Sequence, residues 1–206
     1  MQFLAPLNGP LDLEIGGTVF GEEIQDAYVR RYRLRKHSTL AEASGTIASA
    51  RPPHDMFIFT LVRNPYTRLF SIFSFLRKWE NYNPDLLSMM KSFVDFREFV
   101  ESDLFMRLPG PDNMFRPQCD WLKLDGKIAE NVRCFKVEEV SNAIETIRLE
   151  IARRGVDTSM LLGSFPHANK SDNRDVQSLD LPPDLVAKIN SFYAEDFEAF
   201  DYPSTQ

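Results

Sequence analysis

The sequence contains few of the residues that build disulfides or metal centres. Among its 206 residues there are two cysteines, Cys119 and Cys134, and three histidines. Two cysteines are too few for the disulfide framework of a small secreted domain, and no cysteine or histidine cluster has the spacing of a zinc site. We therefore expect two ordinary thiols and no metal.

Long apolar runs and an excess of positive charge are also missing. No segment reaches the roughly 20 consecutive apolar residues of a membrane-spanning helix, and the N-terminus lacks the basic start and apolar middle of a signal peptide. The formal net charge of -6 argues against general binding to nucleic acid or to anionic membranes. We expect a cytoplasmic chain with no membrane span and no nucleic-acid partner.

The sequence does contain enough apolar material for one core. A hydrophobic content of 43% over this length predicts a single domain over residues 1–206. Residues 1–21 carry several prolines and glycines and predict an irregular N-terminal segment. Two strand-like runs, 56–63 and 127–137, are each followed by a helical pattern. This order predicts an α/β fold with a parallel sheet and helices on its faces.

The strongest local pattern lies in residues 56–71. The apolar, β-branched and aromatic run Met56–Val62 predicts a buried strand. Asn64 is suited to cap the following helix and Pro65 to occupy its first turn, where no backbone N–H is needed. Arg63 therefore stands at the carboxyl end of a core strand, which is where open α/β sheets bind ligands.

The segment that begins at Arg63 and ends at Ser71 reads Arg-Asn-Pro-Tyr-Thr-Arg-Leu-Phe-Ser. It resembles the 3′-phosphate-binding motif of sulfotransferases that use 3′-phosphoadenosine 5′-phosphosulfate (PAPS). The similarity is closest to sulfotransferase family 2, which includes carbohydrate sulfotransferases. The resemblance implies that Arg63 and Ser71 bind the 3′-phosphate of the nucleotide. The chemistry agrees, because a guanidinium offers paired donors to phosphate oxygens, while a hydroxyl and a helix N-terminus add more.

Four further segments, in the order of the family, extend the resemblance over roughly residues 36–202. They are Lys36–Thr39, Phe115–Gln118, Pro166–Ser171 and Phe192–Tyr202. The resemblance implies a P-loop NTPase-like three-layer fold with a central parallel sheet flanked by helices. It also implies transfer of a sulfuryl group from PAPS, the co-substrate, to a hydroxyl acceptor without a metal. We expect that acceptor to be a carbohydrate.

The resemblance is weakest at the N-terminus. Members of this group begin with a strand and a loop of the form Pro-Lys-Thr-Gly-Gly-Thr-Ser, whose backbone N–H groups and lysine hold the 5′-phosphosulfate. Here residues 14–18, Glu-Ile-Gly-Gly-Thr, repeat only the Gly-Gly-Thr. A degenerate loop and an ordinary glycine turn are two interpretations. We favour a third, in which the chain opens downstream of the missing loop through truncation, a misplaced start codon or real loss, so that the fold is N-terminally incomplete.

Two other functions remain open beside an active sulfotransferase. A catalytically inactive or truncated relative would bind the nucleotide, or only a protein partner, without transferring sulfate. A phosphate-binding kinase-like enzyme is disfavoured, because the sequence has no Gly-x-x-x-x-Gly-Lys-Ser/Thr loop.

His37 is the candidate catalytic base. Its segment Lys-His-Ser-Thr is similar to one that lies near the active site in the family, and sulfuryl transfer to an alcohol needs a base that takes the hydroxyl proton. The alternative is a histidine that caps or packs at the start of a helix over residues 40–50. His167 is a second candidate base, and we expect His54, which precedes the strand, to be exposed.

Two cations follow in the polar loop of residues 165–174. The resemblance implies that its Asn-Lys-Ser lies close to the nucleotide, so Lys170 and Arg174 are candidate ligands of a phosphate or of the acceptor. A surface loop without a binding role is the alternative. For Gln118, contact with an acceptor and a structural hydrogen bond remain open. Aromatic residues spaced by three around Phe96 and Phe99 predict a helix whose apolar face lies in the core, and the wall of a groove is the alternative.

Overall fold

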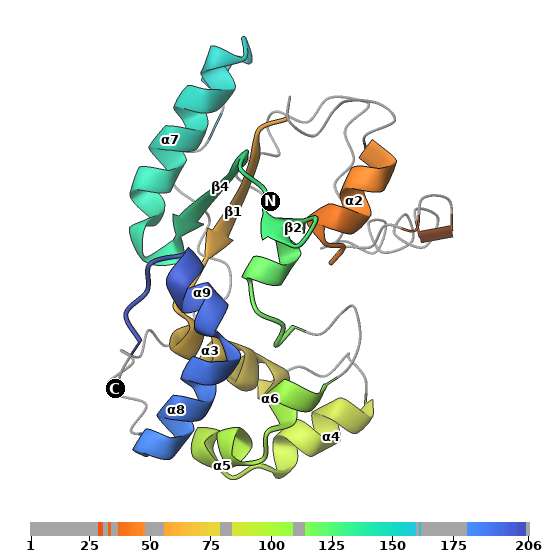
Figure 1. Cartoon of the computed structure of the whole chain (residues 1–206), viewed down its shortest axis with the longest axis vertical. Helices are drawn as coiled ribbons and strands as arrows, with labels where there is room; N and C mark the ends of the chain where they lie inside the picture. Colours follow the sequence, from red (N-terminus) through yellow and green to blue (C-terminus); the bar gives the residue numbers. More distant parts are fainter. Residues whose placement is uncertain are drawn as a thin grey trace. The chain divides into compact units, whose positions relative to one another are not determined.

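A computed structural model of the chain describes residues 29–30, 33, 37–47, 56–78, 84–108, 114–159, 161 and 181–204. The chain divides into two compact units, each assembled from two separate segments. The first, which we call the sheet unit, comprises residues 1–61 and 121–168, and the second, the helical unit, comprises residues 62–120 and 169–206. The described residues form helices and a few short strands, a mixed arrangement consistent with an α/β fold (Figure 1).

The sheet unit is built on two parallel strands. β1 (Ile58–Val62) is hydrogen-bonded to β4 (Val132–Lys136), and Figure 1 shows both arrows running in the same direction. α7 (Val140–Arg153) follows β4 and buries Ala143, Ile144 and Ile147. Within the described residues the parallel sheet has these two strands, so the three-layer P-loop arrangement stays a prediction.

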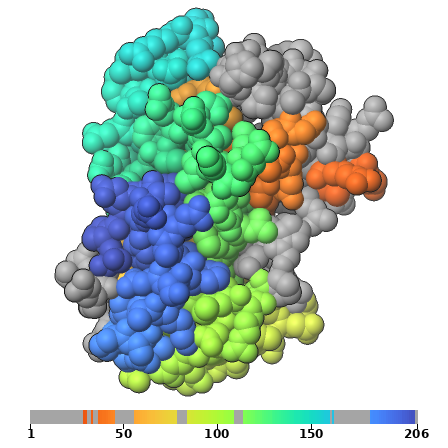
Figure 2. Space-filling view, viewed as in Figure 1, coloured from red at the N-terminus to blue at the C-terminus, as the bar shows by residue number. Residues whose placement is uncertain are grey.

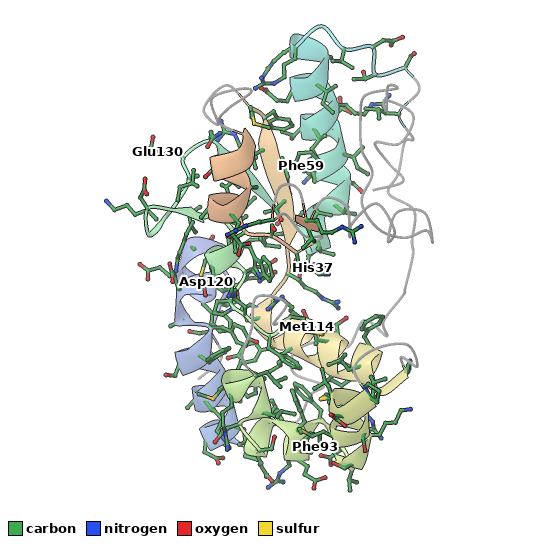
Figure 3. The ribbon with its side chains drawn as sticks, turned by 90° about the vertical axis from the view of Figure 1, so that its right-hand side faces the viewer. His37, Phe59, Phe93, Met114, Asp120 and Glu130 are labelled. Carbon is green, nitrogen blue, oxygen red and sulfur yellow. The ribbon has the colours of Figure 1, made fainter. Side chains whose placement is uncertain are left out.

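The core of the sheet unit forms where α7 meets β1. The apolar side of α7 packs against the aromatic side chains that flank and enter the strand, and Figure 3 shows Phe59 turned toward this helix. Phe57 and Phe59 stack with ring centroids 5.5 Å apart. The helix begins at Val140, directly after Glu139. A short 3-10 turn, η4 (Val137–Glu139), joins β4 to the helix.

A tight hairpin precedes β4. β2 (Lys123–Leu124) and β3 (Lys127–Ile128) pair antiparallel across Asp125 and Gly126, whose φ angles are 51° and 80°. Two positive φ angles are what a two-residue hairpin turn requires, and an Asp-Gly pair tolerates them. The predicted strand over 127–137 is therefore too long, because its first residues belong to the hairpin.

α2 (Leu40–Ile47) also lies in the sheet unit.

The helical unit consists of six helices within the described residues. They are α3 (Pro65–Lys78), α4 (Pro84–Ser92), α5 (Phe96–Glu101), α6 (Leu104–Arg107), α8 (Pro183–Phe192) and α9 (Ala194–Ala199). In Figure 2 the blue atoms of α8 and α9 lie directly against the yellow-green atoms of α5 and α6. The chain turns at Tyr193, between α8 and α9. None of the helices among the described residues is both long and apolar enough to cross a membrane.

An aromatic cluster forms the core of the helical unit. Phe99 is fully buried, and its ring centroid lies 5.2 Å from that of Phe73 and 5.5 Å from that of Phe115. Phe96 also contacts Phe73, at 5.5 Å. The prediction of a core helix from the aromatic spacing is confirmed. Full burial of one such side chain is worth about 1.5–3 kcal/mol.

Candidate functional site

The junction between β1 and α3 is capped as the sequence predicts. The side-chain oxygen of Asn64 accepts a hydrogen bond of 3.0 Å from the backbone N–H of Tyr66. Its carbonyl accepts the first helical bond, 2.8 Å, from the N–H of Arg68. Asn64 is therefore the N-cap, and Pro65 occupies the first helical position, where a missing N–H costs nothing.

Arg63 leaves the strand immediately before this cap. Its Nε donates to the hydroxyl of Thr67 at 3.2 Å, and that hydroxyl donates to the carbonyl of Asn64 at 3.1 Å. The side chain of Arg63 therefore lies against the first turn of α3. It is half-buried, so it is not sealed inside the apolar core.

Ser71 lies on the same face of α3 as Thr67. Residues four apart in a helix are surface neighbours about 5–6 Å apart. The core residues of the helix, which include Leu69 and Phe73, occupy the opposite face. Ser71 is half-buried. The structure therefore brings Arg63, through its contact with Thr67, to the helical face that carries Ser71.

The local electrostatics favour an anion at this junction. α3 has 14 residues and no acidic side chain in its first turn. The helix dipole leaves a partial positive charge at that end, which the guanidinium of Arg63 increases. This combination suits a phosphate or sulfate group.

The backbone of Arg63 is fixed by a buried glutamine. Its N–H donates to Oε1 of Gln118 at 2.9 Å, and its carbonyl accepts from Nε2 of Gln118 at 2.8 Å. Asp196, fully buried in α9, accepts from the backbone N–H groups of Gln118 and Cys119, both at 2.8 Å. Of the two roles open for Gln118, the structure supports the structural hydrogen bond.

Sequence reasoning missed Asp196, although a signal was present. Its neighbours Tyr193, Phe197 and Phe200, in or beside α9, are all buried. Asp196 is the acidic residue among these buried positions. A carboxylate at a core position of an amphipathic helix is rare unless hydrogen-bonded partners satisfy it. That position therefore indicates a buried polar network.

The second arginine of the motif, Arg68, forms a structural hydrogen bond to a distant part of the chain. Its Nη2 donates to the carbonyl of Met114 at 2.7 Å, and Figure 3 shows Met114 beside the first turns of α3. Tyr193 donates its hydroxyl to the carbonyl of Phe115 at 2.7 Å. Burial raises the pKa of the Tyr193 phenol well above its usual range, partly opposed by the nearby Arg68. Tyr193 is therefore a neutral donor at physiological pH.

His37 belongs to the sheet unit and is exposed (Figure 3). Its ring meets that of Trp121 edge-on, with centroids 6.3 Å apart. The cap of α2 comes from Thr39, which exchanges hydrogen bonds with Glu42 at 2.7 Å and 3.2 Å. The capping role open to His37 is thus filled by another residue, and its role as a base stays a prediction. Lys170, Arg174 and the other two histidines lie outside the described residues.

Three possible metal ligands meet beside the buried network. The thiol of Cys119 and the carboxylates of Asp120 and Glu195 have ligand atoms within 4.8 Å of one another. Sequence spacing could not indicate this group, because Glu195 lies far along the chain. Neither Cys119 nor Cys134 forms a disulfide. The expectation of no metal stays a prediction.

Comparison with known proteins gives one finding. No curated protein matches the chain, and no solved structure matches it either. The family model described as "Sulfotransferase family" matches residues 22–203. The match therefore covers the β1–α3 junction, Gln118, Asp196 and His37.

Proposed function

The chain belongs to the sulfotransferase family, and from this we propose that it binds PAPS and transfers its sulfuryl group to a hydroxyl acceptor, a carbohydrate. Family membership indicates sulfuryl transfer in general. The observation that carries the finer proposal is the β1–α3 junction. There a guanidinium, a helix N-terminus and a helical hydroxyl lie on one side of α3.

Arg63 and Ser71 would hold the 3′-phosphate of the nucleotide. The guanidinium supplies charge-assisted hydrogen bonds, which are about twice as strong as neutral ones. The contact of its Nε with Thr67 supports a fixed orientation for the group. Lys170 and Arg174 are proposed to reach other phosphate oxygens or the acceptor.

His37 would serve as the general base. The acceptor oxygen attacks sulfur as its proton passes to the imidazole, and a new O–S bond forms. The bond between sulfur and the 5′-phosphate oxygen breaks, and adenosine 3′,5′-bisphosphate leaves. No metal takes part in this step.

A nucleotide-binding relative without activity is the second candidate. The specific observation behind it is that the 206 residues contain no Pro-Lys-Thr-Gly-Gly-Thr-Ser loop for the 5′-phosphosulfate. Such a protein would retain the 3′-phosphate site at Arg63. Binding and turnover are therefore tested separately.

The binding test is calorimetric titration with adenosine 3′,5′-bisphosphate. Replacing Arg63 by Ala should weaken binding by about 10–100-fold, because a charge-assisted hydrogen bond contributes about 1.5–3 kcal/mol. The matched control is Arg97→Ala, which removes an exposed guanidinium paired with Glu101 on α5. It should leave the affinity unchanged. Equal affinities for wild type and Arg63→Ala would refute the proposed 3′-phosphate site.

The turnover test is transfer of labelled sulfate from PAPS to a panel of glycans. Incorporation into a glycan supports the sulfotransferase proposal and identifies the acceptor class. A folded sample that binds the bisphosphate yet labels no acceptor supports the binding relative instead.

A further inference from the structure

We infer that Gln118, oriented by Asp196, is the positioning residue for Arg63 and thereby sets affinity for the 3′-phosphate without touching the nucleotide. This inference rests on the proposed function, because it concerns the same site. All three residues belong to the helical unit.

The side-chain amide of Gln118 forms hydrogen bonds with both backbone polar groups of Arg63. The side-chain amide accepts from the N–H of Arg63 at 2.9 Å and donates to its carbonyl at 2.8 Å. It thus gives the residue after β1 the pair of hydrogen bonds that a neighbouring strand would supply. With N–H and C=O both engaged, the backbone at Arg63 is held, and so is the direction in which its side chain leaves the chain.

Asp196 determines which way the amide points. Its Oδ2 accepts from the backbone N–H of Gln118 at 2.8 Å and from Nε2 of Gln118 at 3.3 Å. The Asp196 oxygen and the Arg63 carbonyl both accept hydrogen bonds here, so both must face the NH₂ end of the amide. A flipped amide would set its oxygen against Asp196 and against the carbonyl of Arg63. The carboxylate therefore leaves Oε1 as the acceptor for the N–H of Arg63.

The guanidinium is held at its other end by Thr67. The Nε contact of 3.2 Å limits rotation of the guanidinium plane once the backbone is fixed. Bidentate recognition of a phosphate depends on the direction of that plane. Loss of the Gln118 amide should therefore act on the 3′-phosphate and spare the rest of the nucleotide.

The test compares two ligands, adenosine 3′,5′-bisphosphate and adenosine 5′-monophosphate, by calorimetric titration. The dissociation constant of the monophosphate divided by that of the bisphosphate measures how much the 3′-phosphate contributes to affinity. Gln118→Met, which keeps the length but removes the amide, should reduce this ratio by about tenfold, the size of one charge-assisted hydrogen bond. Its affinity for the monophosphate should change less than twofold. Gln118→Asn, which retracts the amide by one methylene, should act in the same direction and serves where the Met variant does not fold.

A purely structural role predicts a different result. Tyr193→Phe is the matched control, because it removes a buried hydrogen bond to the carbonyl of Phe115 in the same unit. It should lower the melting temperature and leave the ratio unchanged. In an Arg63→Ala background, Gln118→Met should have no further effect on the ratio. A Gln118 variant that lowers both affinities equally, or that still lowers the ratio without Arg63, overturns the inference.

The outcomes separate the two proposals. If Arg63→Ala leaves the ratio unchanged, the 3′-phosphate site itself is wrong. If Arg63→Ala lowers the ratio and the folded Gln118 variants do not, the site stands and the positioning role of Gln118 is refuted.

Discussion

The surroundings of Arg63 and His37, the two leading site candidates, differ sharply. Arg63 is half-buried, with its backbone fixed by Gln118 and its Nε by Thr67. His37 is exposed, with its ring edge-on to Trp121. Arg63, the proposed phosphate ligand, is therefore held by the buried hydrogen-bond network of its unit, whereas His37, the proposed base, lies at the surface. Substitutions at the two places should therefore affect different quantities.

The largest expected effect is on turnover, at His37. His37→Ala should reduce the rate of sulfate transfer by about 100–10,000-fold, the usual contribution of a general base. Because the side chain is exposed, the free energy of unfolding should change by less than about 0.5 kcal/mol. Single-turnover assays and urea denaturation measure the two quantities. If His37→Ala transfers sulfate at the wild-type rate, His37 is not the general base and another residue must take that role.

Asp196 should show the opposite behaviour, with a large cost in stability. Asp196→Ala leaves the backbone N–H groups of Gln118 and Cys119 without their acceptor in a buried place. Unsatisfied buried donors cost about 1–3 kcal/mol each, so we expect a loss of about 3–5 kcal/mol in the free energy of unfolding. Urea denaturation followed by circular dichroism measures this. A loss below about 1 kcal/mol would mean that the network does not hold the junction.

Thr67 should show an intermediate effect, on binding alone. Thr67→Val removes the acceptor of the Arg63 Nε and should weaken binding of the bisphosphate by about three- to tenfold. Thr146→Val is the matched control, because Thr146 also donates to the carbonyl of a residue a turn earlier, Asn142, but lies exposed on α7. Calorimetric titration of both variants tests the contact. Equal affinities for the two variants would show that the Nε contact contributes nothing to phosphate binding.

Local features of the fold could be predicted from the sequence. The strand that ends before Arg63, the cap at Asn64 and the first-turn Pro65 depend on neighbouring residues, and each is confirmed. The aromatic core around Phe99 follows from helical spacing and is confirmed as well. The two parallel strands agree with the predicted α/β order.

Contacts between distant segments could not be predicted in the same way. Asp196 and Gln118 are separated by 78 positions, and no local pattern indicates which buried donor a carboxylate will meet. The apolar spacing of residues 185–200 continues through Tyr193, so the sequence does not indicate the break between α8 and α9 there. The hairpin at Asp125 and Gly126 did carry a local signal, an Asp-Gly pair, which the alternating residues that follow obscured.

The smallest expected effect concerns a half-buried carboxylate, Asp103, which contrasts with the fully buried Asp196. The ion pair with Lys188, whose Nζ lies 2.5 Å from Oδ1, lowers the pKa of Asp103. A pKa that is lower in the folded than in the unfolded chain stabilises the fold above the unfolded value, about 3.9. That contribution is lost as the pH falls through the folded value.

Lys188→Met should therefore destabilise the protein at neutral pH and much less in acid. Lys188 also donates to the carbonyls of Val100 and Glu101, at 3.3 Å each, and those bonds do not titrate. Melting temperatures of wild type and variant, measured from pH 7 down to pH 2, should converge at the acid end except for this constant part. A difference that stays the same at every pH would assign the whole effect to the carbonyl bonds. The ion pair between Lys188 and Asp103 would then contribute nothing measurable to stability.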